Sequence, residues 1–128
     1  MNKLIIDAVN KDIFLMIIMN DNIYNISHEN SKTNYEKITI LINDFLNSKN
    51  FKINDISSIY INRGPGSFAG IRNSISVVKA INLALKIDYY CYSIEDFNSQ
   101  NNFKYENIPN LCDKFKIKKN LINLIYIS

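Results

Sequence analysis

The chain has 128 residues, 47% of them hydrophobic and 21% charged, which is the size and balance of one globular domain. Its net charge of +3 is below that of a typical nucleic-acid-binding domain, and no apolar run approaches the roughly 20 residues of a membrane span. Two distant cysteines, Cys91 and Cys112, exclude a disulfide framework or a thiolate zinc site, so the expected location is the cytoplasm.

Three β-favouring runs open the sequence, at Lys3–Val9, Ile13–Met19 and Asn22–His28. Only two or three polar residues separate one run from the next, which predicts hairpins. The first two runs are almost wholly apolar, as in strands that are covered on both faces. The third mixes polar and apolar residues, so we expect it at the edge of the sheet.

A helix is predicted next, over Thr33–Ser48. Its apolar residues recur at 3.6-residue spacing on one side, and Ile40 alone projects from the polar side. Ser31 and Thr33 are candidate caps, and Glu36 follows Thr33 at the spacing of a capping box.

The rest of the chain predicts two more strands joined by a helix. Ser58–Asn62 is a short strand, a second helix ends near Lys86, and Asp88–Tyr92 is another strand. Beyond a short helical start at Ser93–Asp96 the pattern weakens, and one strand-like run, Leu121–Ile127, closes the chain. The order β-β-β-α-β-α-β predicts an α/β fold with a mixed sheet and right-handed crossovers.

The densest motif lies between the fourth strand and the second helix. All three glycines of the chain fall within Arg63–Arg72, where Pro65 fixes a turn and Ser67 is placed to cap the helix. Bare N–H groups there could bind an anion, but neither the P-loop nor the dinucleotide pattern is met. A tight turn that allows close packing is the alternative. The residues of this signature loop are Arg63, Gly64, Pro65, Gly66, Ser67, Phe68 and Gly70.

The nine residues Gly64–Arg72, GPGSFAGIR, resemble the GPGSFTGLR signature of the bacterial TsaB (YeaZ) family. Ile5–Asp7 and Ser93–Phe97 extend the resemblance. It implies a single actin-like, ribonuclease H-like lobe over residues 1–97, with the second lobe largely missing and residues 98–128 a shortened remnant. The sequence departs from the family pattern at Ala8 and Ala69, where threonine is usual, and at Asn34, where histidine is common.

The resemblance also implies a function. Family members take part in making N6-threonylcarbamoyladenosine at position 37 of tRNA as non-catalytic scaffold subunits, without a cofactor. The expected partners are a TsaD-type transferase, bound helices against helices, and through it a TsaE-type ATPase. A homodimer in the absence of partners and indirect contact with tRNA are also expected. The alternative is a reduced kinase-like lobe with weak ATP binding of its own.

The residues themselves favour a protein without catalysis. Asp7–Asn10 lacks the glycine and hydroxyl with which actin-like ATPases hold phosphate. A lone histidine, His28, cannot supply the three protein ligands of a catalytic zinc ion. Cys91 has no histidine in its pattern to activate it and is expected to be a buried, small apolar side chain.

A partner-binding surface is predicted on the second helix. Its core-facing residues are expected to be Val77, Val78, Ile81, Ala84 and Leu85, which places other apolar side chains on the outside. An apolar patch with a basic rim is typical of an interface, although the chain's own C-terminal segment could also cover it. The predicted interface residues are Ile40, Arg72, Ile75, Ser76, Lys79 and Leu83.

A separate basic stretch lies near the C-terminus. It contains Lys114, Lys116, Lys118 and Lys119. A solvated flank is the simpler interpretation, and direct binding of tRNA phosphate is the alternative, which predicts steeply salt-dependent binding.

Overall fold

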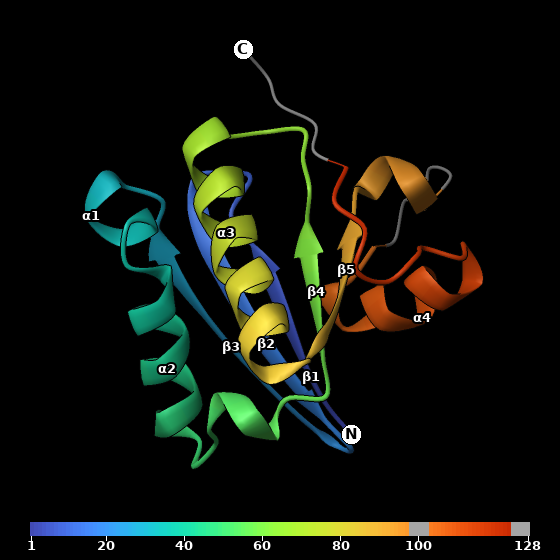
Figure 1. The fold of residues 1–128 in the computed structure, drawn as a ribbon, viewed down its shortest axis with the longest axis horizontal. Helices are drawn as coiled ribbons and strands as arrows, with labels where there is room; N and C mark the ends of the chain where they lie inside the picture. The colour runs from blue at the N-terminus through green and yellow to red at the C-terminus, as the bar shows by residue number, and fades with distance from the viewer. Residues whose placement is uncertain (98–102, 124–128) are drawn as a thin grey trace.

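Within residues 1–97 and 103–123, which the computed structural model describes, five strands form one mixed sheet (Figure 1). Their order across the sheet is β3-β2-β1-β4-β5. The first three strands pair in antiparallel hairpins, and β4 and β5 add in parallel beside β1. This confirms the predicted mixed sheet and the edge position of the third strand. The strands are β1 (Asn2–Asp7), β2 (Asp12–Met19), β3 (Asn22–Glu29), β4 (Ser58–Asn62) and β5 (Asp88–Tyr92).

The helix predicted over Thr33–Ser48 is divided into two. The chain leaves helical geometry at Lys37, with φ −128° and ψ 35°. Thr33 lies inside the first piece, so the capping box expected with Glu36 does not form, and Ser31 is the N-cap residue without a side-chain hydrogen bond. The helices are α1 (Lys32–Tyr35), α2 (Ile38–Ser48), α3 (Phe68–Leu85) and α4 (Ile108–Lys114), with single 3₁₀ turns at Ile53–Asp55 (η1), Ile94–Phe97 (η2) and Tyr105–Asn107 (η3).

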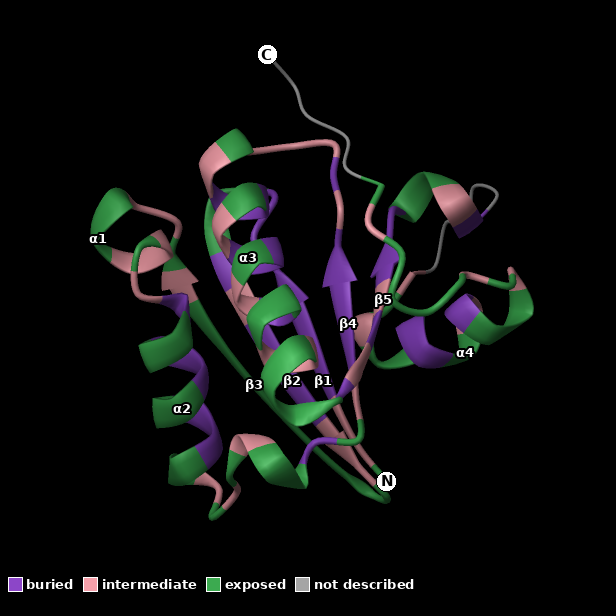
Figure 2. Ribbon diagram, in the orientation of Figure 1, coloured by how far each residue is buried: buried purple, intermediate pink, exposed green. Residues whose placement is uncertain are grey.

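Helices cover both faces of the sheet (Figure 1). On one face, α2 and α3 pack on β1 and β4 around residues such as Leu4, Ile6 and Ile59, all completely buried. The predicted apolar side of α2 is buried here, whereas Figure 2 shows its outer side exposed, together with most of β3. The larger core therefore lies between the sheet and these two helices.

The opposite face of the sheet is covered by the segment after residue 102, for which no regular secondary structure was predicted before residue 121. Ile108 and Cys112 of α4 are buried against Ile5, Tyr60 and other residues of a second apolar cluster. A helix of seven residues gives too short a periodic signal to be recognised from sequence. The division of the chain after residue 97 stays a prediction.

The strand predicted at Leu121–Ile127 is not formed in its described part. Residues 121–123 have no regular structure, and residues 124–127 lie outside the described residues. The contact with the sheet occurs slightly earlier, where Lys119 forms an isolated antiparallel bridge with Tyr90 of β5.

In residues 1–97 and 103–123, no helix has both the length and the apolar character that crossing a membrane requires.

Candidate functional site

The signature loop rests on the turn between β1 and β2. The backbone N–H of Ser67 donates to the carbonyl oxygen of Val9 at 2.8 Å. A Cβ atom on Gly66 would overlap that same carbonyl oxygen, and a Cβ on Gly70 would overlap the carbonyl oxygen of Ala8. Both glycines are therefore required by close backbone approach, which supports the packing interpretation of the motif.

Local hydrogen bonds start α3 as the sequence predicts. The Ser67 side chain accepts a hydrogen bond from the Gly70 N–H at 3.2 Å, which confirms the predicted cap. Gly64 has a φ of 113°, a conformation that favours glycine, and its peptide bond to Pro65 is cis.

Asn30, which sequence reasoning missed, fixes the turn beneath the loop. Its Nδ2 donates to the carbonyl oxygens of Ala8 and Asn10, both at 2.8 Å, and lies 2.7 Å from where a Cβ on Gly70 would be. The only signal was the position of this asparagine directly after the third strand.

Asp7 is buried at the end of β1, beside the end of β4. The two strands are parallel, so Asp7 is brought next to Asn62. One carboxylate oxygen accepts from the Val9 N–H at 3.2 Å, and the other accepts from Asn62 Nδ2 at 3.1 Å and from the Tyr105 hydroxyl at 2.8 Å. Asn62 Oδ1 in turn accepts from the Gly64 N–H at 2.9 Å. The carboxylate thus anchors both the turn and the signature loop.

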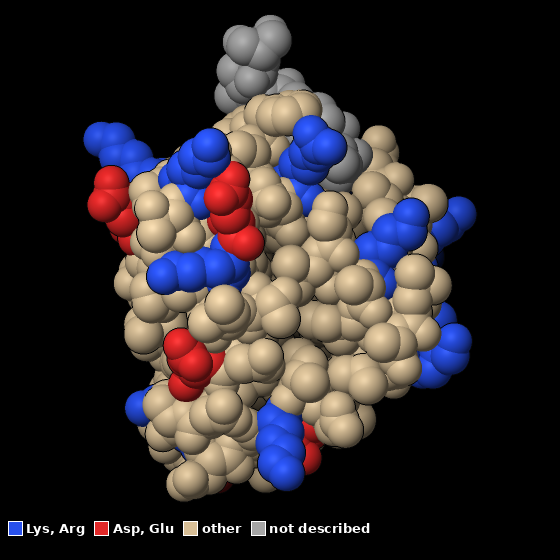
Figure 3. Space-filling view, turned by 60° about the vertical axis from the view of Figure 1, so that its left-hand side comes forward, with Lys and Arg blue, Asp and Glu red and all other residues tan. Residues whose placement is uncertain are grey.

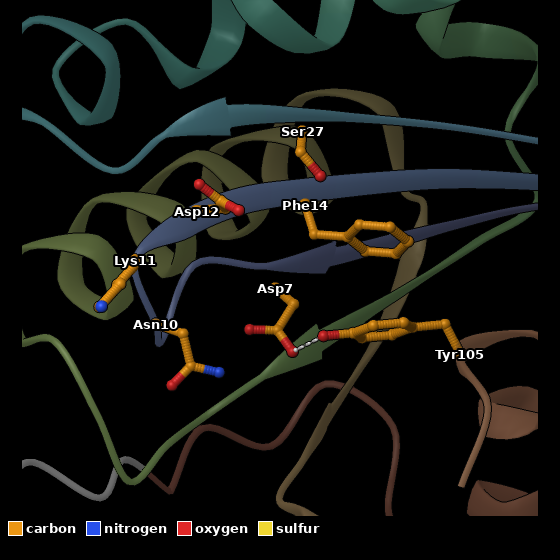
Figure 4. A pocket seen from close by; sticks show the side chains of 7 residues that line it. All are labelled: Asp7, Asn10, Lys11, Asp12, Phe14, Ser27 and Tyr105. Carbon is orange, nitrogen blue, oxygen red and sulfur yellow. Dashed lines mark hydrogen bonds between the residues drawn. The ribbon is translucent and has the colours of Figure 1, made fainter.

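Tyr105 reaches this carboxylate from the segment before α4 (Figure 4). Its ring stacks on Phe14 with 4.1 Å between ring centroids. Burial, and then the negative charge of Asp7, raise the pKa of the Tyr105 hydroxyl well above its ordinary value, so it is a neutral hydrogen-bond donor at physiological pH. No sequence pattern indicates this pairing, because 98 positions separate the two residues.

Two cavities flank Tyr105 and share Asp7 and Asn10. One, of about 420 Å³, opens toward Asp12 and Ser27 on β2 and β3. The other, of about 370 Å³, lies over the ends of β1, β4 and β5 and is lined by Asn62, Gly64, Pro65, Ser93 and Glu95 among others. This is the edge of a parallel sheet at which ligands commonly bind.

The described residues offer little for covalent or metal chemistry. Burial raises the pKa of the Cys91 and Cys112 thiols to about 12, so both are protonated and unreactive at neutral pH. Within residues 1–97 and 103–123, no three His, Cys, Asp or Glu side chains are grouped as a metal site would require. His28 lies half-buried on the edge strand β3, as expected.

Arg63 and Phe68, both in the signature loop, have different environments. Arg63 is half-buried, pairs with Asp96 at 2.7 Å and donates to the carbonyl oxygen of Asn123 at 2.9 Å. Phe68 is 51% exposed, and the Arg72 guanidinium lies 5.9 Å from the centre of its ring. Arg63 therefore ties the loop to the C-terminal segment, while Phe68 lies on the surface.

The predicted interface residues separate into an exposed majority and one core residue. Ile40 and Leu83 are 55% and 64% exposed, and Arg72, Ser76 and Lys79 are also exposed. Ile75 is buried, so its predicted outward position is wrong. The buried stripe of α3 comprises Gly70, Ile71, Ser74, Ile75 and Val78.

Four other core-facing assignments on α3 differ from the prediction or hold only in part. Ala84 and Leu85, expected to face the sheet, are exposed. Val77 and Ile81 are half-buried beside the core. Phe68, the first residue of α3, is a further exposed apolar residue. Leu85 lies on the same side of the helix as the buried Ser74 and Val78, and it is exposed at the last position of α3.

The sequence comparisons give proteins named for the threonylcarbamoyl modification of tRNA. The model described as TsaD: tRNA N6-adenosine threonylcarbamoyltransferase matches residues 25–112. Two proteins named tRNA threonylcarbamoyladenosine biosynthesis protein TsaB, from two Buchnera aphidicola strains (Sg and Bp), are similar to this chain. The Sg protein is 32% identical over 68 residues, and this match covers 53% of this chain. The Bp protein is 30% identical over 71 residues, and this match covers 48% of this chain. Each match covers 32% of the relative, so the similarity spans about a third of these proteins.

Solved structures show the same fold. YeaZ from Pseudomonas aeruginosa superposes with a TM-score of 0.66 at 17% identity, covering 78% of this chain and 49% of that protein. RuvC from T. thermophilus, in complex with a Holliday junction substrate, gives a TM-score of 0.55 at 8% identity and covers 96% and 84%. These neighbours confirm the expected ribonuclease H-like lobe. Sequence and structure together place this chain in the TsaB (YeaZ) family.

Proposed function

We propose that this chain is a non-catalytic subunit in the biosynthesis of tRNA threonylcarbamoyladenosine, and that it supports a TsaD-type transferase by docking on it through α2 and α3. The observation that carries the proposal is the docking face, the exposed outer side of these helices. It comprises Ile40, Phe68, Arg72, Ser76, Lys79 and Leu83.

Apolar exposure on the docking face is high for a surface. Ile40, Phe68 and Leu83 are each more than half exposed. Large apolar side chains beside Arg72 and Lys79 form the mixture of apolar centre and polar rim that protein interfaces use. Because α3 contains no acidic residue, an acidic rim on the partner would complement it.

The hydrogen bonds of Asp7 support a subunit without catalytic activity of its own. Three donors already occupy its carboxylate, from Val9, Asn62 and Tyr105, which leaves few acceptor positions to hold a phosphate-bound metal ion. Its neighbour Ala8 lacks the hydroxyl that a nucleotide-binding turn would offer. We therefore assign Asp7 a positioning role for the signature loop.

Light scattering of the chain mixed with the TsaD-type protein of the same organism tests this proposal. We expect a heterodimer that Leu83→Glu weakens at least tenfold, because a charge would be buried at the interface. Leu121→Glu is the matched control, since Leu121 is 54% exposed but lies outside the docking face.

Other outcomes of the mixture are informative. Equal weakening by both variants, or no complex at all, would contradict the proposal. A homodimer that the partner displaces, and recruitment of a TsaE-type ATPase only by the preformed pair, would extend it.

A second candidate function is nucleotide binding, favoured by the 370 Å³ cavity at the ends of the parallel strands. It is lined by two carboxylates, Asp7 and Glu95, which disfavour phosphate unless a cation accompanies it. Calorimetry with MgATP tests it. Ile94 lines this cavity and is 39% exposed, so binding that Ile94→Glu abolishes would favour this function over a purely structural subunit.

A further inference from the structure

The lysine-rich segment Lys116–Lys119 is held against the outer edge of β5. Lys119 bridges to Tyr90, and the Asn120 N–H donates to the Tyr89 carbonyl oxygen at 2.7 Å. The Asn120 side chain also accepts from the Tyr89 N–H at 2.9 Å. The sheet therefore fixes the backbone of this segment, while its three lysine side chains are exposed.

Two of the acidic side chains around the segment are engaged in ion pairs, and a third, Asp113, lies three residues before Lys116. Asp96 lies 2.7 Å from Arg63, and Asp88 lies 3.6 Å from the ammonium group of Lys119. In the part of the chain that the structure describes, the other two lysines of the segment form no ion pair. Positive charge along this edge is therefore only partly compensated.

A small concavity lies between these cations. It has a volume of about 160 Å³ and is lined by Arg63, Lys116 and Lys118, with Asp96 and Asn123 beside them. It is large enough for a phosphate group, and its basic side chains come from the signature loop and from the segment after α4. Their arrangement arises only in the folded chain.

Basic charge continues from this edge toward the end of α3. Lys86, directly after α3, is exposed, and the Asn82 side chain of α3 lies 3.4 Å from that of Asn120. Figure 3 shows basic side chains along its right-hand margin, whereas acidic and basic side chains lie together on its left and near the bottom.

We propose that this surface, the basic edge, binds the phosphate backbone of RNA. Its members are Lys86, Lys116, Lys118 and Lys119, and Arg63, paired with Asp96, lines the concavity beside them. Exposed lysines on a fixed backbone neutralise successive phosphates and release their counterions, which drives binding without reading sequence. The choice of tRNA as the RNA rests on the proposed function, whereas contact with RNA phosphate follows from charge and geometry.

Fluorescence anisotropy with a labelled, unmodified tRNA and the full chain, from 50 to 300 mM KCl, tests the basic edge. We expect affinity to fall steeply with salt. Lys116→Gln/Lys118→Gln should weaken binding and reduce the slope of log K against log salt by about 1.5, since each lost phosphate contact removes roughly 0.7–0.9. Lys32→Gln/Lys52→Gln removes the same charge from exposed lysines near α1 and η1 and should leave the slope unchanged.

Circular dichroism of both double variants establishes that their fold is intact. Equal slopes for the two variants would overturn the proposal, because net charge alone would then explain binding. So would binding of inorganic phosphate or of phosphatidylglycerol vesicles in place of tRNA. The anisotropy experiment contains no transferase, so a negative result would not contradict the proposed docking face. A negative result in the light-scattering experiment would likewise not contradict RNA binding by the basic edge.

Discussion

At the scale of single residues, the signature loop is explained by contact between two stretches of backbone. Gly66 and Gly70 lie over the carbonyl oxygens of Val9 and Ala8, at distances that no side chain permits. Asp7 then holds the loop through Asn62, so a buried charge that resembles a catalytic residue acts as a structural anchor. A carboxylate whose oxygens already accept three hydrogen bonds has few positions left for other partners.

Gly66→Ala tests this explanation. The new Cβ would overlap the backbone of Val9, which cannot move without disturbing the hairpin between β1 and β2. We expect a loss of about 1–3 kcal/mol in the free energy of unfolding, measured by urea titration. Ala80→Ser, on the exposed side of α3, is the control and should change stability by less than about 0.5 kcal/mol. A Gly66→Ala protein as stable as the native chain would contradict the close-approach argument.

At the scale of elements, α3 has two different faces. Its inner stripe is buried on the sheet, and its outer side carries the docking face. Idealised helical angles placed Ile75 outside, but the start of α3 is set by the loop and the Ser67 cap, and these determine which stripe meets the sheet. The rotation of a helix with apolar residues on several sides is thus decided by its ends and neighbours.

Alanine substitutions distinguish the two faces. Ile75→Ala should cost about 2–4 kcal/mol in the free energy of unfolding, because it leaves a cavity in the core. Leu83→Ala should change stability by less than about 0.5 kcal/mol, since Leu83 is 64% exposed, yet weaken the complex with the transferase. Thermal or urea unfolding of both variants checks this, and comparable losses would show that the assigned rotation of α3 is wrong.

At the scale of the whole molecule, two cores lie on the two faces of one sheet. Cys91 belongs to the core under α2 and α3, and Cys112 belongs to the core under α4. Each thiol is buried, with a pKa raised from 9.0 to about 12, so both faces strongly favour the protonated form.

Alkaline pH should therefore lower the free energy of unfolding through a thiol on each face of the sheet. Above pH 9 the unfolded chain releases thiol protons that the folded chain retains until about pH 12, so the unfolded state binds fewer protons and stability falls as pH rises across that window. Below pH 9 the contribution is fully present. Urea titrations at pH 8 and 10.5 measure the loss, and Cys112→Ala should reduce it by removing one of the two groups. Equal losses in the native and Cys112→Ala proteins would assign the effect to other groups.

Much of the architecture was predictable because its signals are local. Hairpin strands alternate with short polar gaps, α2 has a regular apolar side, and the motif at Gly64–Arg72 marks a strand–loop–helix junction. The exposure of Ile40 and the cap at Ser67 depend on nearest neighbours along the chain, and both predictions are confirmed. At these positions the local sequence pattern predicts the structure that is formed.

Other features depend on residues far apart in the sequence. Tyr105 meets Asp7 across 98 positions, and the lysines after α4 meet Arg63 only because the C-terminal segment crosses the end of β5. The burial of Ile75 likewise depends on how α3 is seated on the sheet. The strands and the signature loop are predictable from periodicity and motif spacing, because backbone preferences act over a few residues. The family is recognisable from the contiguous motif at residues 64–72. The anchored carboxylate, the covered second face and the basic edge needed the folded chain, because long-range packing alone brings their parts together.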